Sequence, residues 1–528
     1  MESQSEPLSG ADTAWLRMDS ATNLMVINAM LIVDTIDFHD FKDVVAKRLL
    51  RFDRFNKRPV CYSGLYYWES DPHFDINCHV RQVALTGSAD KTALQKFVSE
   101  QMSIPLDVNK PLWQFQFVEN YQGGTAILVR VHHCYADGIS LIRVFDTLTD
   151  PAANVTELKD FEDESLLRFA SGQNATRSGP AEYVRSAAQE TLQNSTKDDA
   201  DPDKRTGESA DVNNPWGIYQ QLIESIWQSI ERYSKVGARV SEESLHLVRE
   251  PLMLKEYAKE ILKIINEVTH LASLPSDPLT LLKGPVGVRK SCAWSEPLPI
   301  EDLRRAGRLL GCKINDILVS AVAGALGSYL RAQGEKVEST TIHATVPVNI
   351  RQGEEVVSAE NDKLGNNFGT VFLPLPIGID NPIERVYKVK HDMLGLRNSM
   401  QPGISFGLLH ALGMMPKTVQ KPLLEMFSRK STAVLSNVPG VRESRYLCGK
   451  EISEQMFWVP QTGDIGLGMS LISYGGNVQF GVALDAKLCS EPAELVALCV
   501  QEMKRYIQMT DPFQEIQNAD RRRRTDQS

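Results

Sequence analysis

The segment at residues 131–138, Val-His-His-Cys-Tyr-Ala-Asp-Gly, places the strongest constraint on how this chain folds. The residues leading into it, 126–131, are apolar except for Arg130 and predict a short buried strand. Beyond the segment, apolar residues recur at helix spacing, at Leu141, Val144, Phe145 and Leu148. The motif therefore lies at the end of a strand, where a buried scaffold presents side chains to a cavity.

The two adjacent histidines of this motif cannot share one role. Neighbouring residues on a strand point to opposite faces, so only one of His132 and His133 faces a given cavity, and the other needs a structural partner. An imidazole titrates near ~6.5 and is suited to taking a proton from an alcohol. Spacing alone leaves open whether the pair is catalytic or structural. Asp137 and Gly138 are typical of a tight turn.

The composition is that of a globular protein with more than one domain. The chain has 528 residues, of which 42% are hydrophobic and 23% charged. Its net charge of -10 gives no support to a nucleic-acid partner. The eight cysteines occur singly, without C-x-x-C pairs, which argues against a zinc knuckle or a disulfide framework and indicates a reducing compartment.

Contact with lipid, if it occurs, is predicted to be at a surface. The N-terminus is polar and carries no pattern of a signal peptide. The longest apolar runs, Leu24–Val33 and Ile317–Ala325, are shorter than the ~20 residues that span a bilayer. The run Arg521 to Arg524 is interpreted first as a solvated end, with weak attraction to anionic lipid as the alternative.

Periodicity and composition together divide the chain into five parts, and the mixed strands and helices predict two layered α/β domains. Strands are expected at 25–34, 341–350 and 434–439, and a hairpin at 469–484 that turns at Gly475–Gly476–Asn477. The expected parts are an N-terminal domain at 5–150, a disordered or mobile insertion at 151–214, a helical connection at 215–290, a C-terminal domain at 291–512 and a polar tail at 513–528.

Several blocks, in order, resemble the bacterial wax ester synthase/diacylglycerol acyltransferases, a family within the CoA-dependent acyltransferases. The His-His-x-x-x-Asp-Gly motif alone is shared with peptide-synthetase condensation domains. The further blocks that carry the resemblance are Leu8–Asp12 with Trp15, Pro111–Leu112–Trp113, Asn315–Asp316, Pro347–Arg351, Gly365–Asn366–Asn367 and Ser436–Gly440. The resemblance covers most of residues 8–505, and the insertion is the main departure.

The resemblance implies two CoA-dependent-acyltransferase-like domains with a tunnel between them. A fatty acyl group would pass from acyl-CoA, a substrate and not a cofactor, to diacylglycerol or a long-chain alcohol. No cofactor or metal is expected. The implied setting is cytoplasmic, peripherally associated with a membrane or lipid-inclusion surface, with a homodimer as one option.

The resemblance also implies roles for individual residues. His133 would be the general base and His132 supporting, while Asp137 would hold the motif loop and Gly138 would permit its turn. A thioester is already an activated acyl donor, so the alcohol needs a base and an oxyanion donor but not necessarily an enzyme nucleophile.

The other blocks keep two interpretations each. Pro111, Leu112 and Trp113 would line or buttress the acyl channel, or form a turn with a core tryptophan. Asn315, followed by Asp316, would donate a hydrogen bond near the thioester oxygen or cap the following helix. Ser436 and Asn437 would form a turn or a polar wall.

Five competing hypotheses remain. Cys134 would form an acyl-enzyme only with a lowered thiol pKa, of which the sequence gives no sign. Gly403–Gly407 matches the G-x-S-x-G nucleophile elbow but lacks the preceding strand. Metal binding by His132, His133 and Asp137 is disfavoured because strand neighbours diverge. The last two hypotheses are a lipid-surface binding protein without activity and a condensation-type enzyme with another acceptor.

Overall fold

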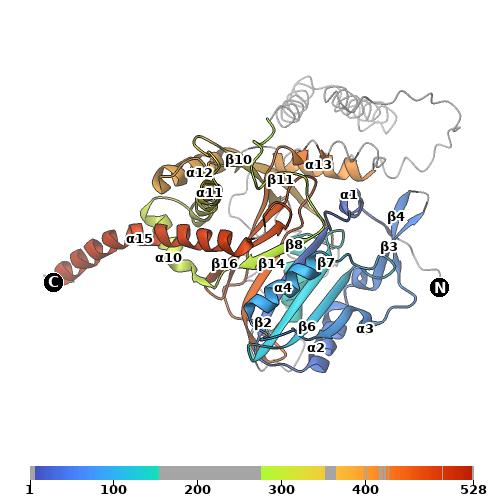
Figure 1. The fold of residues 1–528 in the computed structure, drawn as a ribbon. Helices are drawn as coiled ribbons and strands as arrows, with labels where there is room; N and C mark the ends of the chain where they lie inside the picture. The colour runs from blue at the N-terminus through green and yellow to red at the C-terminus, as the bar shows by residue number, and fades with distance from the viewer. Residues whose placement is uncertain are drawn as a thin grey trace, which may run out of the picture.

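The computed structural model describes residues 6–153, 275–350 and 364–525, except residues 63, 398, 400, 415–419, 421–423, 426 and 490. Within these residues two mixed sheets lie next to each other, and helices pack against both of them (Figure 1). A smaller sheet is formed by β1 (Glu6–Pro7), β4 (Leu65–Ser70) and β3 (Lys57–Tyr62). The layered α/β architecture is the predicted one.

The first large sheet carries the histidine motif. Among the described residues its strand order is β13-β14-β2-β7-β6-β5, and only the β5–β6 pair is parallel. Alternating apolar residues on β7 pack on α2, η1 and α5 on one face and on α4 on the other. The elements are β2 (Val26–Val33), α2 (Phe38–Val44), η1 (Val45–Leu49), η2 (Asp53–Asn56), α3 (Ile76–His79), β5 (Val80–Val83), α4 (Lys91–Met102), β6 (Trp113–Tyr121), β7 (Gly124–His132) and α5 (Gly138–Leu148), with β13 (Tyr446–Leu447) and β14 (Lys450–Trp458).

The second large sheet is built from the C-terminal part of the chain. Its order among the described residues is β11-β10-β12-β15-β16-β8, with β9 also paired to β16. The hairpin of β15 and β16 turns at Gly475 and Gly476, both at positive φ, as predicted. The strands are β8 (Lys290–Trp294), β9 (Leu298–Pro299), β10 (Ile342–Asn349), β11 (Phe368–Leu375), β12 (Ala433–Pro439), β15 (Leu467–Tyr474) and β16 (Asn477–Asp485).

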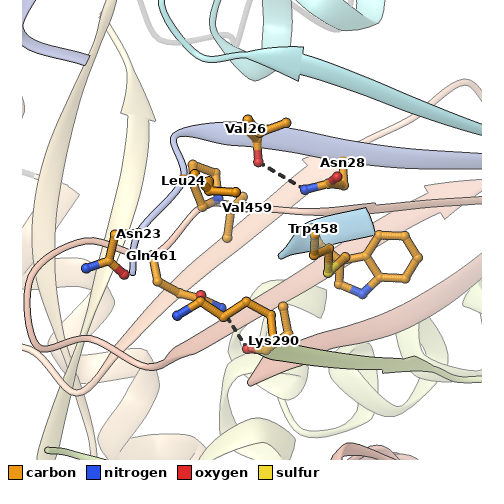
Figure 2. Close-up of a pocket in the computed structure, with 11 residues that line it drawn as sticks. Asn23, Leu24, Val26, Asn28, Lys290, Trp458, Val459 and Gln461 are labelled. Atoms are coloured by element: carbon orange, nitrogen blue, oxygen red, sulfur yellow. Dashed lines mark hydrogen bonds between the residues drawn. The ribbon is translucent and has the colours of Figure 1, made fainter. Parts of the chain in front are cut away.

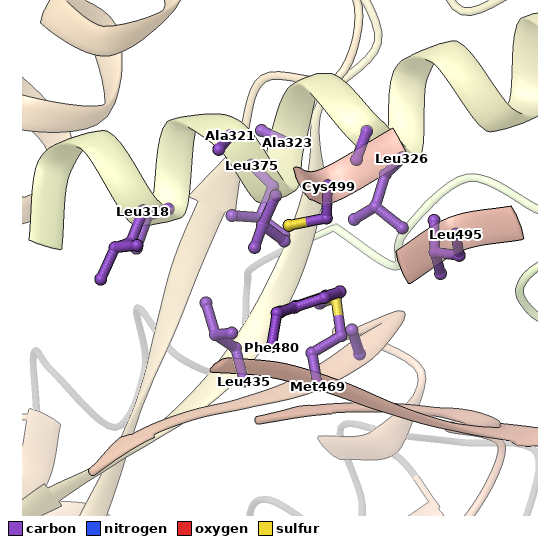
Figure 3. Packing of buried hydrophobic residues seen from close by; sticks show 14 of the residues in the cluster. Leu318, Ala321, Ala323, Leu326, Leu375, Leu435, Met469, Phe480, Leu495 and Cys499 are labelled. Atoms are coloured by element: carbon purple, nitrogen blue, oxygen red, sulfur yellow. The ribbon is translucent and has the colours of Figure 1, made fainter. Parts of the chain in front are cut away.

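Helices α10 (Ile300–Leu309), α11 (Ile314–Ala332), α12 (Pro382–Arg397) and α15 (Pro492–Thr525) belong to this C-terminal part. Figure 3 shows α11 and α15 packed over the sheet, with Leu318 and Leu326 facing Leu435, Met469 and Phe480. The close approach of α11 follows from its small residues, since Gly324 and Ala321 leave room for neighbouring side chains.

The two sheets do not follow the boundaries expected from the sequence. β14, which lies in the expected C-terminal domain, pairs antiparallel with β2, from Ile452 opposite Val33 to Trp458 opposite Asn28. The apolar pattern of 450–458 is the same for any half-buried strand, so periodicity could not identify its partner. The N-terminal sheet is therefore completed by the other half of the chain.

Two further expected boundaries differ from the structure. The expected polar tail at 513–528 is helical up to Thr525, as the end of α15. Residues 154–274, which include nearly all of the insertion and most of the helical connection, lie outside the described residues. The described end of that connection, 275–289, is irregular because Pro275, Pro278 and Pro285 disfavour a helix.

Helix α1 (Gly10–Met18) crosses α13 (Gln401–Met414) at very short range (Figure 1). A Cβ on Gly413 would lie 1.7 Å from the carbonyl oxygen of Gly10, so only glycine fits there. Arg17 also donates to the carbonyl of Gly413 at 3.0 Å. This crossing fixes α1 against the C-terminal part of the chain.

No single helix in the described ranges has the length and apolar composition to cross a bilayer. Helices α10 and α11 meet that test only as a pair, and their axes are bent by 99° at the break between them.

Candidate active site

The motif lies where β7 ends and α5 begins, as predicted. Asp137 is the N-cap of α5, and its carboxylate accepts from the backbone N–H of Ser140 at 2.9 Å. The same carboxylate accepts from the backbone N–H of Asn367 at 2.9 Å. Asp137 therefore joins the motif loop to the C-terminal part of the chain, and Gly138 is the first residue of α5.

His132 has partners within the N-terminal part of the chain. Its Nδ1 accepts from the backbone N–H of Cys134 at 3.1 Å, and its Nε2 lies 3.6 Å from a carboxylate oxygen of Asp19. The ring is buried. These contacts fix the His132 ring against the N-terminal part of the chain.

His133 is held at the junction of the two parts. Its Nδ1 lies 2.9 Å from Oδ1 of Asn366, and its ring stacks on Trp15 with centroids 4.0 Å apart. The ring centroid of Phe368 lies 5.6 Å from that of His133, and 8% of the His133 surface is exposed. Burial lowers the pKa of His133 to about 4. The backbone of His133, Asp137 and Asn366 favour the charged ring, but their combined effect is smaller than that of burial. The imidazole is therefore neutral at neutral pH.

A hydrogen-bonded chain extends behind His133. The amide nitrogen of Asn366 donates to Oδ1 of Asp12 and to the backbone carbonyl of His133, each at 2.8 Å. Arg54 lies 3.4 Å from the other oxygen of Asp12 and donates to the carbonyl of Tyr135 at 3.0 Å. Burial raises the pKa of Asp12, and the nearby Arg54 opposes that shift.

Cys134 is fully buried, and burial raises the pKa of its thiol well above the ordinary value. A thiol in that state is a poor nucleophile, which argues against an acyl-enzyme at this position. Burial likewise raises the pKa of Tyr135, whose hydroxyl donates to the carbonyl of Lys57 at 2.6 Å.

Pro111, Leu112 and Trp113 support the motif from behind. The backbone N–H of Leu112 donates to the hydroxyl of Tyr135 at 2.9 Å, and its carbonyl accepts from the N–H of His132 at 2.9 Å. Trp113 is buried, and its Nε1 donates to the carbonyl of Phe55 at 2.8 Å. Trp113 is therefore a core tryptophan, as in the second interpretation, and the acyl-channel role of the block stays a prediction.

Two sequence comparisons decide the family. The sequence model of the wax ester synthase/diacylglycerol acyltransferase catalytic domain matches residues 8–318, which is more than half of the chain. The model of the WS/DGAT C-terminal domain matches residues 364–506. The chain belongs to the wax ester synthase/diacylglycerol acyltransferase family. It is an O-acyltransferase, as predicted, so the alternative of an inactive binding protein is not supported.

Relatives of this family extend over most of the chain. A Mycobacterium tuberculosis protein, named as a candidate diacylglycerol O-acyltransferase, is 25% identical over 90% of this chain and 86% of its own length. A second M. tuberculosis relative, tgs1, has a similarly provisional name and is 21% identical over 89% of each chain.

Solved structures share the fold. The wax ester synthase/diacylglycerol acyltransferase of Marinobacter aquaeolei VT8 has a TM-score of 0.61 at 17% identity and covers 96% of this chain and 99% of that one. The first condensation domain of the calcium-dependent antibiotic synthetase has a TM-score of 0.55 at 14% identity, covering 96% of both chains. The predicted CoA-dependent acyltransferase architecture is confirmed.

The Asn-Asp block of this family member lies at the start of α11. The side-chain Oδ1 of Asn315 accepts from Nδ2 of Asn437 at 3.0 Å. The helix-cap alternative for Asn315 is wrong, because Lys313 is the N-cap and the carboxylate of Asp316 accepts from its N–H at 2.7 Å. Among the described residues, no hydrogen bond joins the Asn315–Asn437 pair to His133.

Ser436 and Asn437 lie inside strand β12, so the turn that was one alternative for them is wrong. Ser436 is buried and opposite Ser470 of β15, whereas Asn437 is half-buried and reaches Asn315. Parallel pairing to β15 along seven residues explains why the block stays extended.

The G-x-S-x-G match is accidental in this structure. Ser405 lies within helix α13, and its hydroxyl bonds to the backbone of Thr370 and to the carbonyl of Pro402. A nucleophile elbow needs a strand-to-helix turn instead.

A small pocket lies on the His132 side of the sheet, between the ends of β2 and β14 and strand β8 (Figure 2). It is lined by Val26, the strand partner of His132, and by Asn28, Lys290, Trp458 and Gln461, among others. His133 is not one of its lining residues, so this pocket is not the expected tunnel. In the described ranges, no three His, Cys, Asp or Glu side chains are arranged to hold a metal ion.

Sequence reasoning did not identify three residues next to His133 or in the chain behind it, or the arginine that pairs with that chain. Asp12 and Trp15 belong to the opening block and Asn366 to the Gly365–Asn367 block, so the resemblance marked their positions without giving them a role. Arg54 carries no signal in the sequence, because it reaches Asp12 only through the fold.

Proposed function

We propose that this protein transfers a fatty acyl group from acyl-CoA to diacylglycerol, giving triacylglycerol, or to a long-chain alcohol, giving a wax ester, with His133 as the general base. The observation that carries this proposal is a neutral, oriented imidazole at the junction of the two parts of an O-acyltransferase. A neutral ring has a free lone pair, which a general base needs.

In the proposed reaction, Nε2 of His133 takes the proton of the acceptor hydroxyl as its oxygen attacks the thioester carbonyl. The tetrahedral intermediate then collapses, the carbon–sulfur bond breaks, and the imidazolium returns the proton to the CoA thiolate. This direct transfer requires no enzyme nucleophile. It agrees with the buried position of Cys134 and with the position of Ser405 inside a helix.

The polar pair Asn315 and Asn437 is proposed as a wall near the thioester oxygen. Because Oδ1 of Asn315 already accepts from Asn437, its amide nitrogen remains to donate to a developing oxyanion. A single such donor is worth about 2.7–4 kcal/mol of transition-state stabilisation.

The setting of the reaction is also part of the proposal. Acyl-CoA acts as a substrate, without a cofactor, and the two substrates meet in a tunnel between the parts. The protein works in the cytoplasm at a membrane or lipid-inclusion surface, and a homodimer is an option. The family membership and the apolar chemistry of both acceptors support this setting.

The test offers purified protein labelled acyl-CoA together with diacylglycerol and hexadecanol in parallel. His133→Ala and His133→Gln are expected to lose activity by about 100-fold or more, within the range for a general base. The exposed His73→Ala is the matched control and should retain the activity of the unaltered protein.

Full activity in a folded His133→Gln protein would refute the proposed base. Esterification of neither lipid by the unaltered protein would refute the proposed acceptors and favour a condensation-type reaction with another nucleophile.

A further inference from the structure

We propose that Asn366 holds His133 in the tautomer with its hydrogen on Nδ1, leaving Nε2 free, and that Asp12 holds Asn366 in place. Both are positioning residues. This inference rests on the proposed role of His133 as the base and adds how that base is prepared.

A contact with the backbone of His133 determines which terminal atom of Asn366 is the nitrogen and which is the oxygen. One terminal atom of this side chain lies 2.8 Å from the backbone carbonyl oxygen of His133. A carbonyl oxygen only accepts hydrogen bonds, in every protonation state of its surroundings. The atom facing it is therefore the amide nitrogen, and the other terminal atom is the oxygen.

That oxygen determines the tautomer of His133. It lies 2.9 Å from Nδ1 of the imidazole, and an amide oxygen only accepts. Nδ1 must therefore carry the hydrogen. In a neutral ring the second nitrogen then bears the lone pair, and Nε2 is the atom that abstracts a proton.

Asp12 fixes the amide from the other side. Its Oδ1 accepts from the same amide nitrogen at 2.8 Å, and its backbone N–H donates to Ser9, the N-cap of α1, at 3.1 Å. Arg54 lies 3.4 Å from the second carboxylate oxygen. A buried carboxylate with these partners holds Asn366 in one rotamer, and Trp15 on the same helix covers one face of the His133 ring.

The arrangement spans the junction of the two parts of the chain. Asn366 precedes β11 in the C-terminal sheet, whereas Asp12 and His133 belong to the N-terminal part. The base is therefore prepared only when the two parts are docked, and the N–H of Asn367 on Asp137 secures the same loop.

The experiment compares Asn366→Ala with Asn366→Asp in the full-length protein. Alanine removes the acceptor, whereas a protonated aspartate keeps an acceptor oxygen opposite Nδ1 and can donate from its second oxygen to Asp12. We expect kcat to fall about 10- to 100-fold in Asn366→Ala, the range for lost outer partners of a ligating histidine. The KM for acyl-CoA should stay unchanged, and Asn366→Asp, which can make only one of the two donations of the amide, should recover part of kcat. Asn77→Ala, at an exposed position, is the matched control.

The acid limb of the pH profile gives a second kinetic readout. The charged or titratable groups around His133 are Asp137, His132 and, beyond Asn366, Asp12 and Arg54. The hydrogen bond of Asn366 favours the charged ring, so its loss in Asn366→Ala should move the acid limb to lower pH. A merely structural role of Asn366 would not shift it.

The tautomer itself is measured by long-range proton–nitrogen correlation on protein with ¹⁵N-labelled histidine, with the His133 signals assigned by their absence in His133→Gln. The unaltered protein should show hydrogen on Nδ1, and Asn366→Ala a mixture of tautomers. A hydrogen on Nε2 in the unaltered protein, or an unchanged tautomer and kcat in Asn366→Ala, overturns the inference. Because this measurement needs no turnover, its failure is separate from that of the proposed function, which depends on His133→Gln activity.

Discussion

At the scale of single residues, His133 combines two properties that determine its protonation state. It is almost completely enclosed, yet the group beside it is a neutral amide and not a carboxylate. A carboxylate in that position would raise the pKa of the ring, whereas burial beside an amide lowers it. The site therefore has its base ready over a wide range of pH.

The pH dependence follows from this lowered pKa. The base acts only when neutral, so kcat/KM should rise as the pH increases through about 4 and be level above that limb. An ordinary histidine would place the limb near 6.5. A rate profile of the purified enzyme checks this, and an acid limb near 6.5 would contradict it.

The same shift affects stability. The folded pKa of His133 is lower than its unfolded value, so its contribution is complete above 6.5 and is lost as the pH falls from 6.5 towards about 4. His133→Gln should show a weaker loss of stability across this window. Thermal unfolding at several pH values measures the difference.

At the scale of elements, the crossing of α1 and α13 sets the position of the site. Gly10 and Gly413 let the two backbones approach until a methyl group no longer fits, and Asp12 and Trp15 follow on the same helix as Gly10. The distance between these helices therefore determines how well Asn366 and the His133 ring are held.

Gly413→Ala should separate the two helices. We expect the free energy of unfolding to fall by about 1–3 kcal/mol, the usual cost of overpacking, and kcat to fall with it. The matched control is Gly403→Ala on the same helix, where a Cβ would meet nothing within 4 Å. Chemical denaturation and acyl transfer assays on both variants test this. Equal behaviour of the two would show that the crossing is not needed.

At the scale of the whole molecule, the two parts share a sheet and cannot be regarded as independent domains. β14 covers the edge of β2, and β2 in turn pairs with the motif strand β7. Without β14, the apolar strand Val26–Val33 would become an open edge, which favours aggregation.

Division of the chain after residue 274 tests this dependence. The fragment 1–274 alone should be insoluble or unfold without cooperativity, because its sheet lacks β14. Co-expression with fragment 275–528 should restore a soluble complex with transferase activity. A cooperative thermal transition in the isolated first fragment would contradict the prediction.

The sequence predicted the local features of this fold because they depend on neighbouring residues. The strand at 126–131, the turn at Asp137 and the following helix all follow from periodicity and turn chemistry over about twenty residues. The partner of β14 and the contact of Asn366 with His133 depend on residues far apart in the chain, and no local pattern encodes them. The blocks of the family marked Asn366 and Asp12 but not the chemistry between them.

The sharing of the first sheet has a consequence for biosynthesis. Ser453 of β14 bonds to Ile32 of β2 across 421 residues of sequence, so β2 emerges from the ribosome long before the strand that covers it. Contacts of such long range slow folding and prolong the exposure of apolar edges. The N-terminal sheet therefore stays incomplete for most of translation. During that time its unpaired strand edge is a binding site for chaperones that shield exposed strands.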